Sequence, residues 1–233
     1  MLPLMPSLFV AQVASPLLPI ERHYITQTQE IRILPGQLNN VLVFNSNSPE
    51  VIKTEGILLS TFPAEGKIFP NAHLNQALSG RFDLFSHHIA RPLDDRRTLY
   101  QGVIVYNPTT RPITLKILQA ASYLTSPDAP FIELASTVED PIGTVFSGPG
   151  SRLMGDILRG VHQSSFPSQI VIPPLQSQML FSLPINNSAA RSTFMRLESD
   201  GPVYMANLAK YAIAEFPDVA GKTKEAPTAP TPI

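Results

Sequence analysis

The sequence predicts an all-β protein: an antiparallel β-sandwich with one short α-helix near residues 151–161 and long irregular loops. Short apolar and β-branched runs recur along the chain, and residues 102–106 (GVIVY) have the composition of a strand covered on both faces. Residues 113–117 alternate apolar and polar, as a strand with one buried face does. The 24 prolines are spread through the chain, which disfavours long helices. We expect strands 102–106 and 113–117 to pair, forming the basic unit of a sandwich.

Composition excludes several classes of protein. Apolar residues make up 43% of the 233, enough for a substantial core, whereas only 15% are charged, against about 25% in typical soluble domains. The net charge of −1 disfavours a sequence-independent nucleic-acid partner, which requires a basic excess. With no cysteine, the chain has no thiol nucleophile, disulfide or cysteine metal site. We expect no cofactor.

The chain is predicted to have three parts. Residues 1–20 are apolar with small residues at Ala11, Ala14 and Ser15, and they resemble a secretory signal without its basic leader. The alternative is a disordered terminus. Residues 21–214 form the β-sandwich domain, and residues 215–233 are a Pro-rich flexible tail. No later run approaches the ~18 apolar residues of a membrane helix, so we expect the body of the protein to be soluble. The signal-like start predicts an exported protein of the periplasm or envelope, with the cytoplasm as the alternative.

The first half of the domain is expected to contain four strands separated by loops. The segment 62–80 is rich in Pro, Gly, Asn and Ala and predicts a loop, with residues 73–78 (HLNQAL) as an alternative helical turn. Residues 91–97 form a charged connection. The expected strands are 24–34, 41–44, 51–61 with a bulge at Gly56, and 82–90.

The second half contains the one predicted helix. Residues 126–150 are irregular and contain four prolines. From Ser151, which can cap the helix, apolar residues recur at helical spacing until Gly160 helps to end it. Residues 170–185 then predict strand, turn, strand, and residues 193–211 predict a second such unit with its turn at Asp200-Gly201.

Several long blocks resemble a known family. They are PGQLNNVLVFNSNSPEVIKTEGILLSTFPAEG (35–66), GRFDLFSHHIAR (80–91), LQAASYLTSPDAPFIEL (118–134), GPGSRLMGDILRG and RSTFMRLESDGPVYMANLA. Together they are similar to a cyanobacterial family of uncharacterised exported proteins, known as the domain of unknown function DUF3370. The resemblance implies an envelope-associated protein and supplies no catalytic residues. Because family members usually continue into a further β-rich region, it also implies a shortened member.

Asp83, His87 and His88 are the first candidate site. On a strand, Asp83 and His87 project from one face and His88 from the other. An Asp–His pair at this spacing suits a metal site or an oriented general base, and His73 is a third ligand only if its loop folds back. The alternative is a buried histidine that is hydrogen-bonded to a carboxylate or to the backbone. No metal is identified by the sequence.

Gly150, Ser151 and Arg152 are the second candidate, an anion contact at a helix N-terminus. No phosphate-binding fingerprint accompanies them, and Ser151 as a plain helix cap explains the same residues. The charged cluster of Asp94, Asp95, Arg96 and Arg97 is best interpreted as a solvated loop.

Two functions agree with these observations. The favoured hypothesis is a non-catalytic, exported β-sandwich protein with a structural or binding role toward an envelope polymer or protein. The alternative is a metal-dependent or carboxylate hydrolase that acts on envelope polysaccharide around Asp83, His87 and His88. The sequence leans away from an enzyme because no catalytic signature is present. It does not indicate an oligomeric state.

Overall fold

The structure, a computed structural model, describes residues 26, 39–93, 97–186 and 188–212. Of the described residues, 47% lie in strands and 8% in helices, which confirms the β-rich class with one α-helix. The signal-like segment 1–20, the tail 215–233, Asp94, Asp95 and Arg96 lie outside the described residues, as does the expected strand 24–34 apart from Thr26. The chain divides into two compact units, 1–39 and 40–233, and every described strand and helix belongs to the second.

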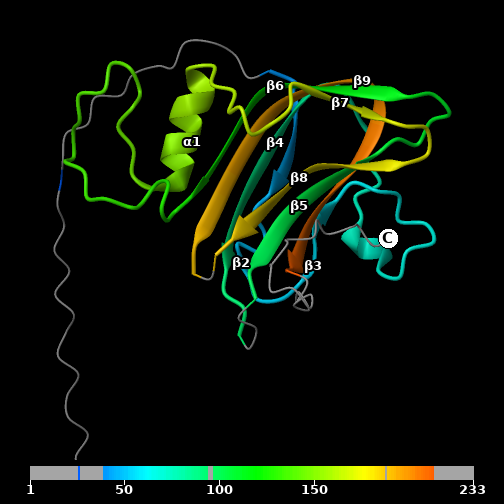
Figure 1. Ribbon diagram of the computed structural model, residues 1–233, viewed down its shortest axis with the longest axis horizontal. Helices are drawn as coiled ribbons and strands as arrows, with labels where there is room; N and C mark the ends of the chain where they lie inside the picture. The colour runs from blue at the N-terminus through cyan, green and yellow to red at the C-terminus, as the bar shows by residue number, and fades with distance from the viewer. Residues whose placement is uncertain (1–25, 27–38, 94–96, 187, 213–233) are drawn as a thin grey trace, which may run out of the picture. The chain divides into compact units, whose positions relative to one another are not determined.

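The strands form two groups that meet in the last strand, β9 (Ala190–Tyr211) (Figure 1). The first, sheet A, has the order β1/β2–β4–β9–β6–β7. The second, sheet B, has the order β3–β9–β5–β8. The remaining strands are β1 (Leu42–Ser46), β2 (Val51–Ile52), β3 (Gly56–Ser60), β4 (Leu78–Ala90), β5 (Leu99–Tyr106), β6 (Ile113–Leu124), β7 (Gln169–Ile172) and β8 (Ser177–Ile185).

The expectation of a purely antiparallel arrangement is wrong, because β1 and β2 run parallel to β4. They occupy successive stretches of the same edge of β4, opposite residues 82–86 and 89–90. The chain then crosses to sheet B as β3 before it returns as β4, and a crossover of this kind allows a parallel pairing. The single strand expected over residues 51–61 is therefore two strands in different sheets.

The prediction of a hairpin around Asp200-Gly201 is also wrong, because β9 continues through these two residues as one strand of 22 residues. Its first part pairs with β6 as far as Ser199, and its second part pairs with β5 from Tyr204. At Gly201 a Cβ atom would lie 3.0 Å from Ile113 Cδ1, so glycine suits this close approach best. The Asp200 carboxylate accepts the Thr114 N–H at 3.0 Å instead of closing a turn.

The expected pairing of residues 102–106 with 113–117 does not occur, since β5 lies in sheet B and β6 in sheet A. The polar segment between them crosses from one sheet to the other. Asn107 is fully buried there, and its side-chain amide donates to the carbonyls of Arg111 at 2.7 Å and Ile172 at 3.0 Å. These bonds satisfy buried polar groups of the connection without a tight hairpin turn.

The core lies between the two sheets. One cluster joins inward side chains from both of them, including Phe82 and Leu197 of sheet A and Val103 of sheet B. A second, smaller cluster includes Ala90, Leu99 and Tyr211. Because a single apolar cluster contains the inner faces of both groups of strands, the two sheets pack face to face.

Helix α1 (Gly148–Leu158) packs on the other face of sheet A. Leu153 and Ile157 are buried against Phe85 and Phe194. The helix begins three residues earlier than predicted, with Ser147 at the cap position and a proline in the first turn, so Ser151 is not the cap. Gly160 ends it as expected: its φ is +82°, and its N–H and that of Val161 donate to carbonyls of the last turn.

The loop expected over residues 62–80 is largely confirmed and contains one short 3-10 turn, η1 (Pro70–Ala72). In the part of the chain that the structure describes, no helix has the length and apolar character that crossing a membrane requires.

Candidate functional site

A layer of polar side chains crosses the interior of the sandwich. Along β4 the inward positions run from Phe82 and Leu84 through Ser86 and His88 to Ala90, and along the last part of β9 Asn207 separates two apolar stretches. The layer therefore lies between the two apolar clusters. We call this set the polar layer: Ser46, Ser86, His88, Gln101, Ser122, Arg191, Thr193 and Asn207, all of them buried except the half-buried Ser122.

Asn207 is the centre of one half of the polar layer. Its side-chain amide donates to Ser46 Oγ at 2.8 Å and to Ser86 Oγ at 3.3 Å. The Gln101 amide donates to Asn207 Oδ1 at 3.3 Å and also to Ser86 Oγ. Gln101 Oε1 is buried and lacks a hydrogen-bond partner among the described residues. Four strands are thus joined through buried polar groups, an arrangement that specifies how the sheets align.

His88 belongs to this network and is fully buried. Its Nδ1 lies 2.9 Å from the Pro49 carbonyl, which can only accept, so Nδ1 carries the proton. Nε2 then accepts, and it lies 3.0 Å from Ser46 Oγ. Burial lowers the pKa of His88, with a further decrease from His87, while the Pro49 carbonyl and Glu50 oppose the shift. The structure thus holds His88 as a neutral, hydrogen-bonded imidazole.

The lowered pKa predicts that the protein loses stability in mild acid. The unfolded chain takes up a proton on this histidine near pH 6.5, whereas the folded protein resists it. The contribution of His88 to the free energy of unfolding is fully present above pH 6.5. It is lost as the pH falls toward the folded-state pKa, by at most about 1.4 kcal/mol per pH unit. Urea unfolding between pH 7.5 and pH 5 measures the slope of the free energy of unfolding against pH. We expect His88→Gln to reduce it, and an unchanged slope would show that His88 is not its source.

Asp83 and His87 face the outer side of sheet A, away from His88, as strand alternation predicts. Asp83 forms an ion pair with Arg81. His87 Nδ1 lies 2.7 Å from Ser192 Oγ, and its Nε2 lies 3.4 Å from Glu50 Oε1. The structure therefore places Asp83 and His88 in separate contacts and joins His87 to two residues that the sequence did not single out.

His73, the conditional third ligand, bonds elsewhere. Its Nδ1 lies 2.8 Å from Ser60 Oγ, and Ser60 is opposite Ala206 in the sheet. Asn207, which contacts His88, follows Ala206 on β9 and projects from the opposite face. His73 and His88 therefore lie on opposite faces of sheet B. No group of three His, Cys, Asp or Glu side chains suited to a metal ion occurs among residues 39–93, 97–186 and 188–212.

The second candidate site, at the start of α1, is already engaged within the protein. Ser151 Oγ accepts the Ser147 N–H at 2.9 Å. The Arg152 guanidinium donates to the Asp128 carbonyl and lies 4.2 Å from the centre of the Tyr123 ring. A Cβ atom at Gly150 would lie 4.0 Å from Ser192 Oγ. Since Ser192 also contacts His87, the structure brings Gly150 and His87, one residue from each predicted site, around one serine.

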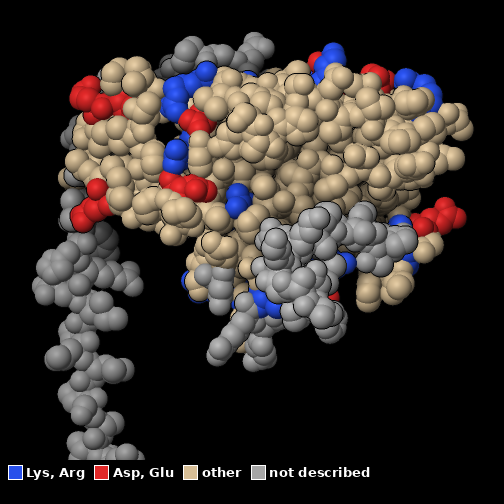
Figure 2. Space-filling view, viewed as in Figure 1, with Lys and Arg blue, Asp and Glu red and all other residues tan. Residues whose placement is uncertain are grey.

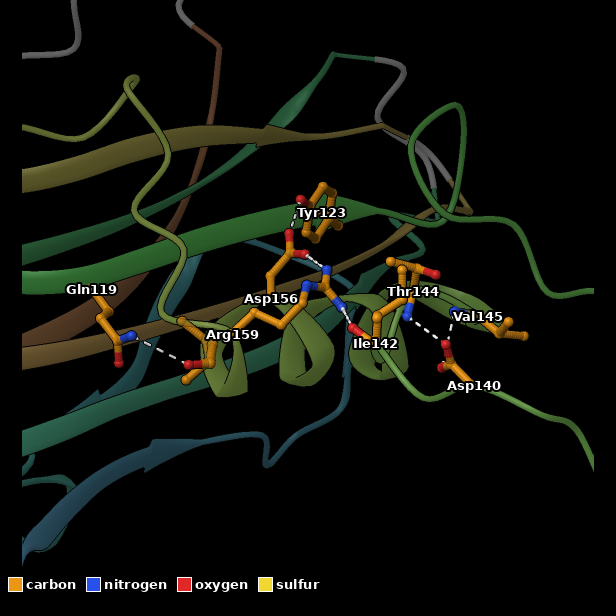
Figure 3. A network of polar contacts seen from close by, with 9 residues as sticks. Gln119, Tyr123, Asp140, Ile142, Thr144, Val145, Asp156 and Arg159 are labelled. Atoms are coloured by element: carbon orange, nitrogen blue, oxygen red, sulfur yellow. Dashed lines mark hydrogen bonds and ion pairs between the residues drawn. The ribbon is translucent and has the colours of Figure 1, made fainter.

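A polar network fixes α1 to its surroundings (Figure 3). Asp156 pairs with Arg159 and accepts the Tyr123 hydroxyl from β6. Arg159 also reaches the Ile142 carbonyl at 3.4 Å, and both oxygens of Asp140 accept backbone N–H groups of the same loop at 2.8 and 3.0 Å. Burial and the bond to Asp156 raise the pKa of Tyr123. Helix, loop and sheet are therefore one unit, and we call its outer part the α1 lobe (residues 130–158).

The α1 lobe exposes many large apolar side chains. Leu158 is 78% exposed, Phe131 69% and Ile142 66%. On the face drawn in Figure 2, charged side chains lie around α1 and its loops, and a wide area over the strands has few of them. Exposed large apolar side chains in this number are typical of an interaction site. The large apolar residues exposed on the lobe are Phe131, Ile132, Leu134, Val138, Ile142, Val145, Met154 and Leu158.

Sequence reasoning did not single out Asn207, Gln101, Arg191 or Ser192. The available signal was a polar residue at an inward position of an otherwise apolar strand, as Gln101 is in LYQGVIVY. Arg191 is 6% exposed and donates to the Pro184 carbonyl at 2.8 Å and to Ser122 Oγ at 2.9 Å. Burial lowers the pKa of Arg191, against a smaller opposing effect of Asp128.

Of the charged cluster 94–97, only Arg97 is described, and it lies 4.8 Å from the Tyr211 ring centre.

The fold and the site define a class: a two-sheet β protein with a polar layer inside and an apolar lobe outside. The profile of a protein family matches residues 29–230, nearly the whole domain and tail. The chain belongs to this family, described as "Protein of unknown function (DUF3370)", which confirms the family resemblance of the sequence blocks. No curated protein and no solved structure matches the chain.

Proposed function

We propose that this protein is a non-catalytic binding protein, exported to the periplasm or cell envelope, that holds a protein or polymer partner on the α1 lobe. The observation that carries the proposal is the set of eight exposed large apolar side chains on the lobe. Asp156 accepts a hydrogen bond from Tyr123 of sheet A, and Arg159 reaches the loop carbonyl of Ile142, so the surface of the lobe is preformed and little conformational entropy is lost on binding. The signal-like start of the chain and its resemblance to a cyanobacterial exported family support the envelope location.

The chemistry expected of the partner depends on the lobe. The apolar side chains of the lobe favour a partner that presents apolar groups. The lobe also has four carboxylates against one guanidinium, which does not favour a strongly acidic polymer: Glu133, Glu139, Asp140 and Asp156 against Arg152. Binding is accordingly expected to persist at high salt, because screening weakens only the exposed charge pairs.

Photo-crosslinking in cell envelopes tests this proposal. A photoreactive residue at position 158 is expected to give an adduct, and Ile142→Ser in the same chain is expected to reduce it. The matched control is a photoreactive residue at position 171, since Val171 is a 52% exposed apolar residue on β7 outside the lobe. An adduct from position 171 alone, or a chain confined to the cytosol, would contradict the proposal.

Hydrolysis is the second candidate, and the contacts of His87 are the observation that favours it. Ser192, His87 and Glu50 form a serine–histidine–carboxylate series, with the N-terminal turn of α1 beside the serine. Ser192 is fully buried, which opposes substrate access. The metal-dependent version has less support, because Asp83 pairs with Arg81 and His88 lies on the inner face.

A fluorophosphonate probe distinguishes the two functions. An enzyme that uses Ser192 would be labelled, and Ser192→Ala would abolish the label, whereas the binding proposal expects no labelling of Ser192. Ser151→Ala is the control for adventitious reaction at a neighbouring serine on α1.

A further inference from the structure

The connection between β3 and β4, residues 61–77, ends in an exposed apolar tip. Ile68 is 88% exposed, Phe69 is 73% exposed, and Leu74, on the other side of η1, is 62% exposed. Single exposed apolar residues are ordinary, but two adjacent residues as exposed as these are unfavourable in water unless they meet an apolar phase. The tip is separate from the α1 lobe in sequence and is attached to sheet B, which is not the sheet under α1.

The tip is held rigidly by the edge of sheet B. The N–H groups of Leu74, Asn75 and Gln76 donate to the carbonyls of residues 60–62 at 2.9–3.0 Å. The His73 ring adds its bond to Ser60. Because these bonds fix the base of the loop, the ordering cost of presenting Ile68 and Phe69 on binding is reduced.

Part of the backbone at the tip is paired within the loop itself. Pro70 has no N–H, the Ala72 N–H donates to the Phe69 carbonyl at 3.0 Å, and the His73 N–H donates to the Pro70 carbonyl at 3.1 Å. Such internal pairing matters where water is scarce, since an unpaired backbone group in an apolar medium is costly.

The tip carries almost no net charge. Glu65 and Lys67 are the formally charged residues between positions 61 and 77, and they cancel. Burial, with Lys67 nearby, lowers the pKa of His73, which favours its neutral form at pH 7. Attraction by charge is therefore a minor part of any interaction at this surface.

We propose that Ile68, Phe69 and Leu74 insert into the interfacial region of a lipid bilayer and dock the protein on the membrane surface. Three such side chains offer roughly 400 Å² of apolar surface, about half of what each partner buries in a stable protein interface. A bilayer requires no complementary surface: it accepts exposed apolar side chains in its interfacial region. This proposal is independent of the binding role of the α1 lobe.

The absence of tryptophan from the chain gives a direct test. In the full chain, Phe69→Trp introduces one indole at the tip. With phosphatidylcholine vesicles we expect its emission to shift to the blue and to be quenched by lipids brominated on their acyl chains. The matched control is Leu158→Trp, at a similarly exposed position on α1, and we expect no change there. A shift at position 158 instead, or at neither position, would overturn the proposal.

Vesicle sedimentation measures the strength of membrane binding. Each apolar side chain that enters the bilayer is worth about a tenfold change in partitioning, so Ile68→Ser with Phe69→Ser is expected to weaken binding by about a hundredfold. Replacing a third of the lipid with phosphatidylserine should change binding less than about twofold, because the tip has no net charge. Circular dichroism verifies that the variant folds. If the double variant instead lowers self-association without lipid, the tip docks protein and the bilayer proposal is wrong.

Discussion

Asn207→Leu is expected to lower the free energy of unfolding by about 3 kcal/mol. The substitution removes the amide that donates to Ser46 and Ser86 and the oxygen that accepts from Gln101. Those groups remain buried between the sheets, where water does not replace the lost bonds. Since domains are typically stable by about 5–15 kcal/mol, the loss is a large share of the total. Urea unfolding followed by far-ultraviolet circular dichroism measures it.

Gln178→Leu is the matched control for this prediction. Gln178 is a polar residue on a strand of the same sheet, but it is exposed. Its substitution is expected to change stability by less than about 0.5 kcal/mol. If Asn207→Leu were as mild as Gln178→Leu, the hydrogen bonds of the polar layer would contribute little to the fold.

Leu197→Ala is the second change with a large expected effect, about 3–4 kcal/mol. Leu197 is fully buried on β9, between Phe82 of β4 and Ile117 of β6. Truncation removes apolar contacts with both neighbouring strands and leaves a cavity that two hydrogen-bonded ladders prevent from collapsing. The midpoint of urea unfolding should fall while the slope stays constant, because the area exposed on unfolding is nearly the same.

Leu158→Ala provides the same chemical change on the surface. Leu158 is 78% exposed on α1, and alanine is a good helix former, so we expect almost no loss of stability. Equal effects of the two substitutions would show that Leu197 does not stabilise the fold as a buried core residue.

The β-rich class was predictable because it depends on local patterns. The apolar run of β5 and the alternation of β6 determine strand character residue by residue, and Gly160 ends the helix through its own backbone. Which strands pair was not predictable in this way. The run from Met195 through Gly201 to Met205 suggests a hairpin because Asp-Gly favours turns, yet the close approach of Ile113 to Gly201 makes the same glycine a position of strand continuity. That contact connects residues far apart in the chain, which local patterns do not reveal.

The candidate site was predictable in part for the same reason. Alternation along β4 correctly separates Asp83 and His87 from His88. It does not reveal that Ser192 would lie opposite His87, or that Ser46 and Pro49 would enclose His88, because those neighbours come from other segments of the chain. The lobe was missed because residues 126–150 have no periodicity, and only their contacts with α1 make them one surface.

The shared strand β9 has a consequence for biosynthesis. It is the final strand of the described fold, and both sheets need it: β4 and β6 flank it in one, β3 and β5 in the other. A nascent chain that has emerged only as far as residue 185 therefore has the outer strands of two sheets and the middle of neither. Productive folding is expected to wait until Tyr211 has left the ribosome, and until then open strand edges need protection from aggregation.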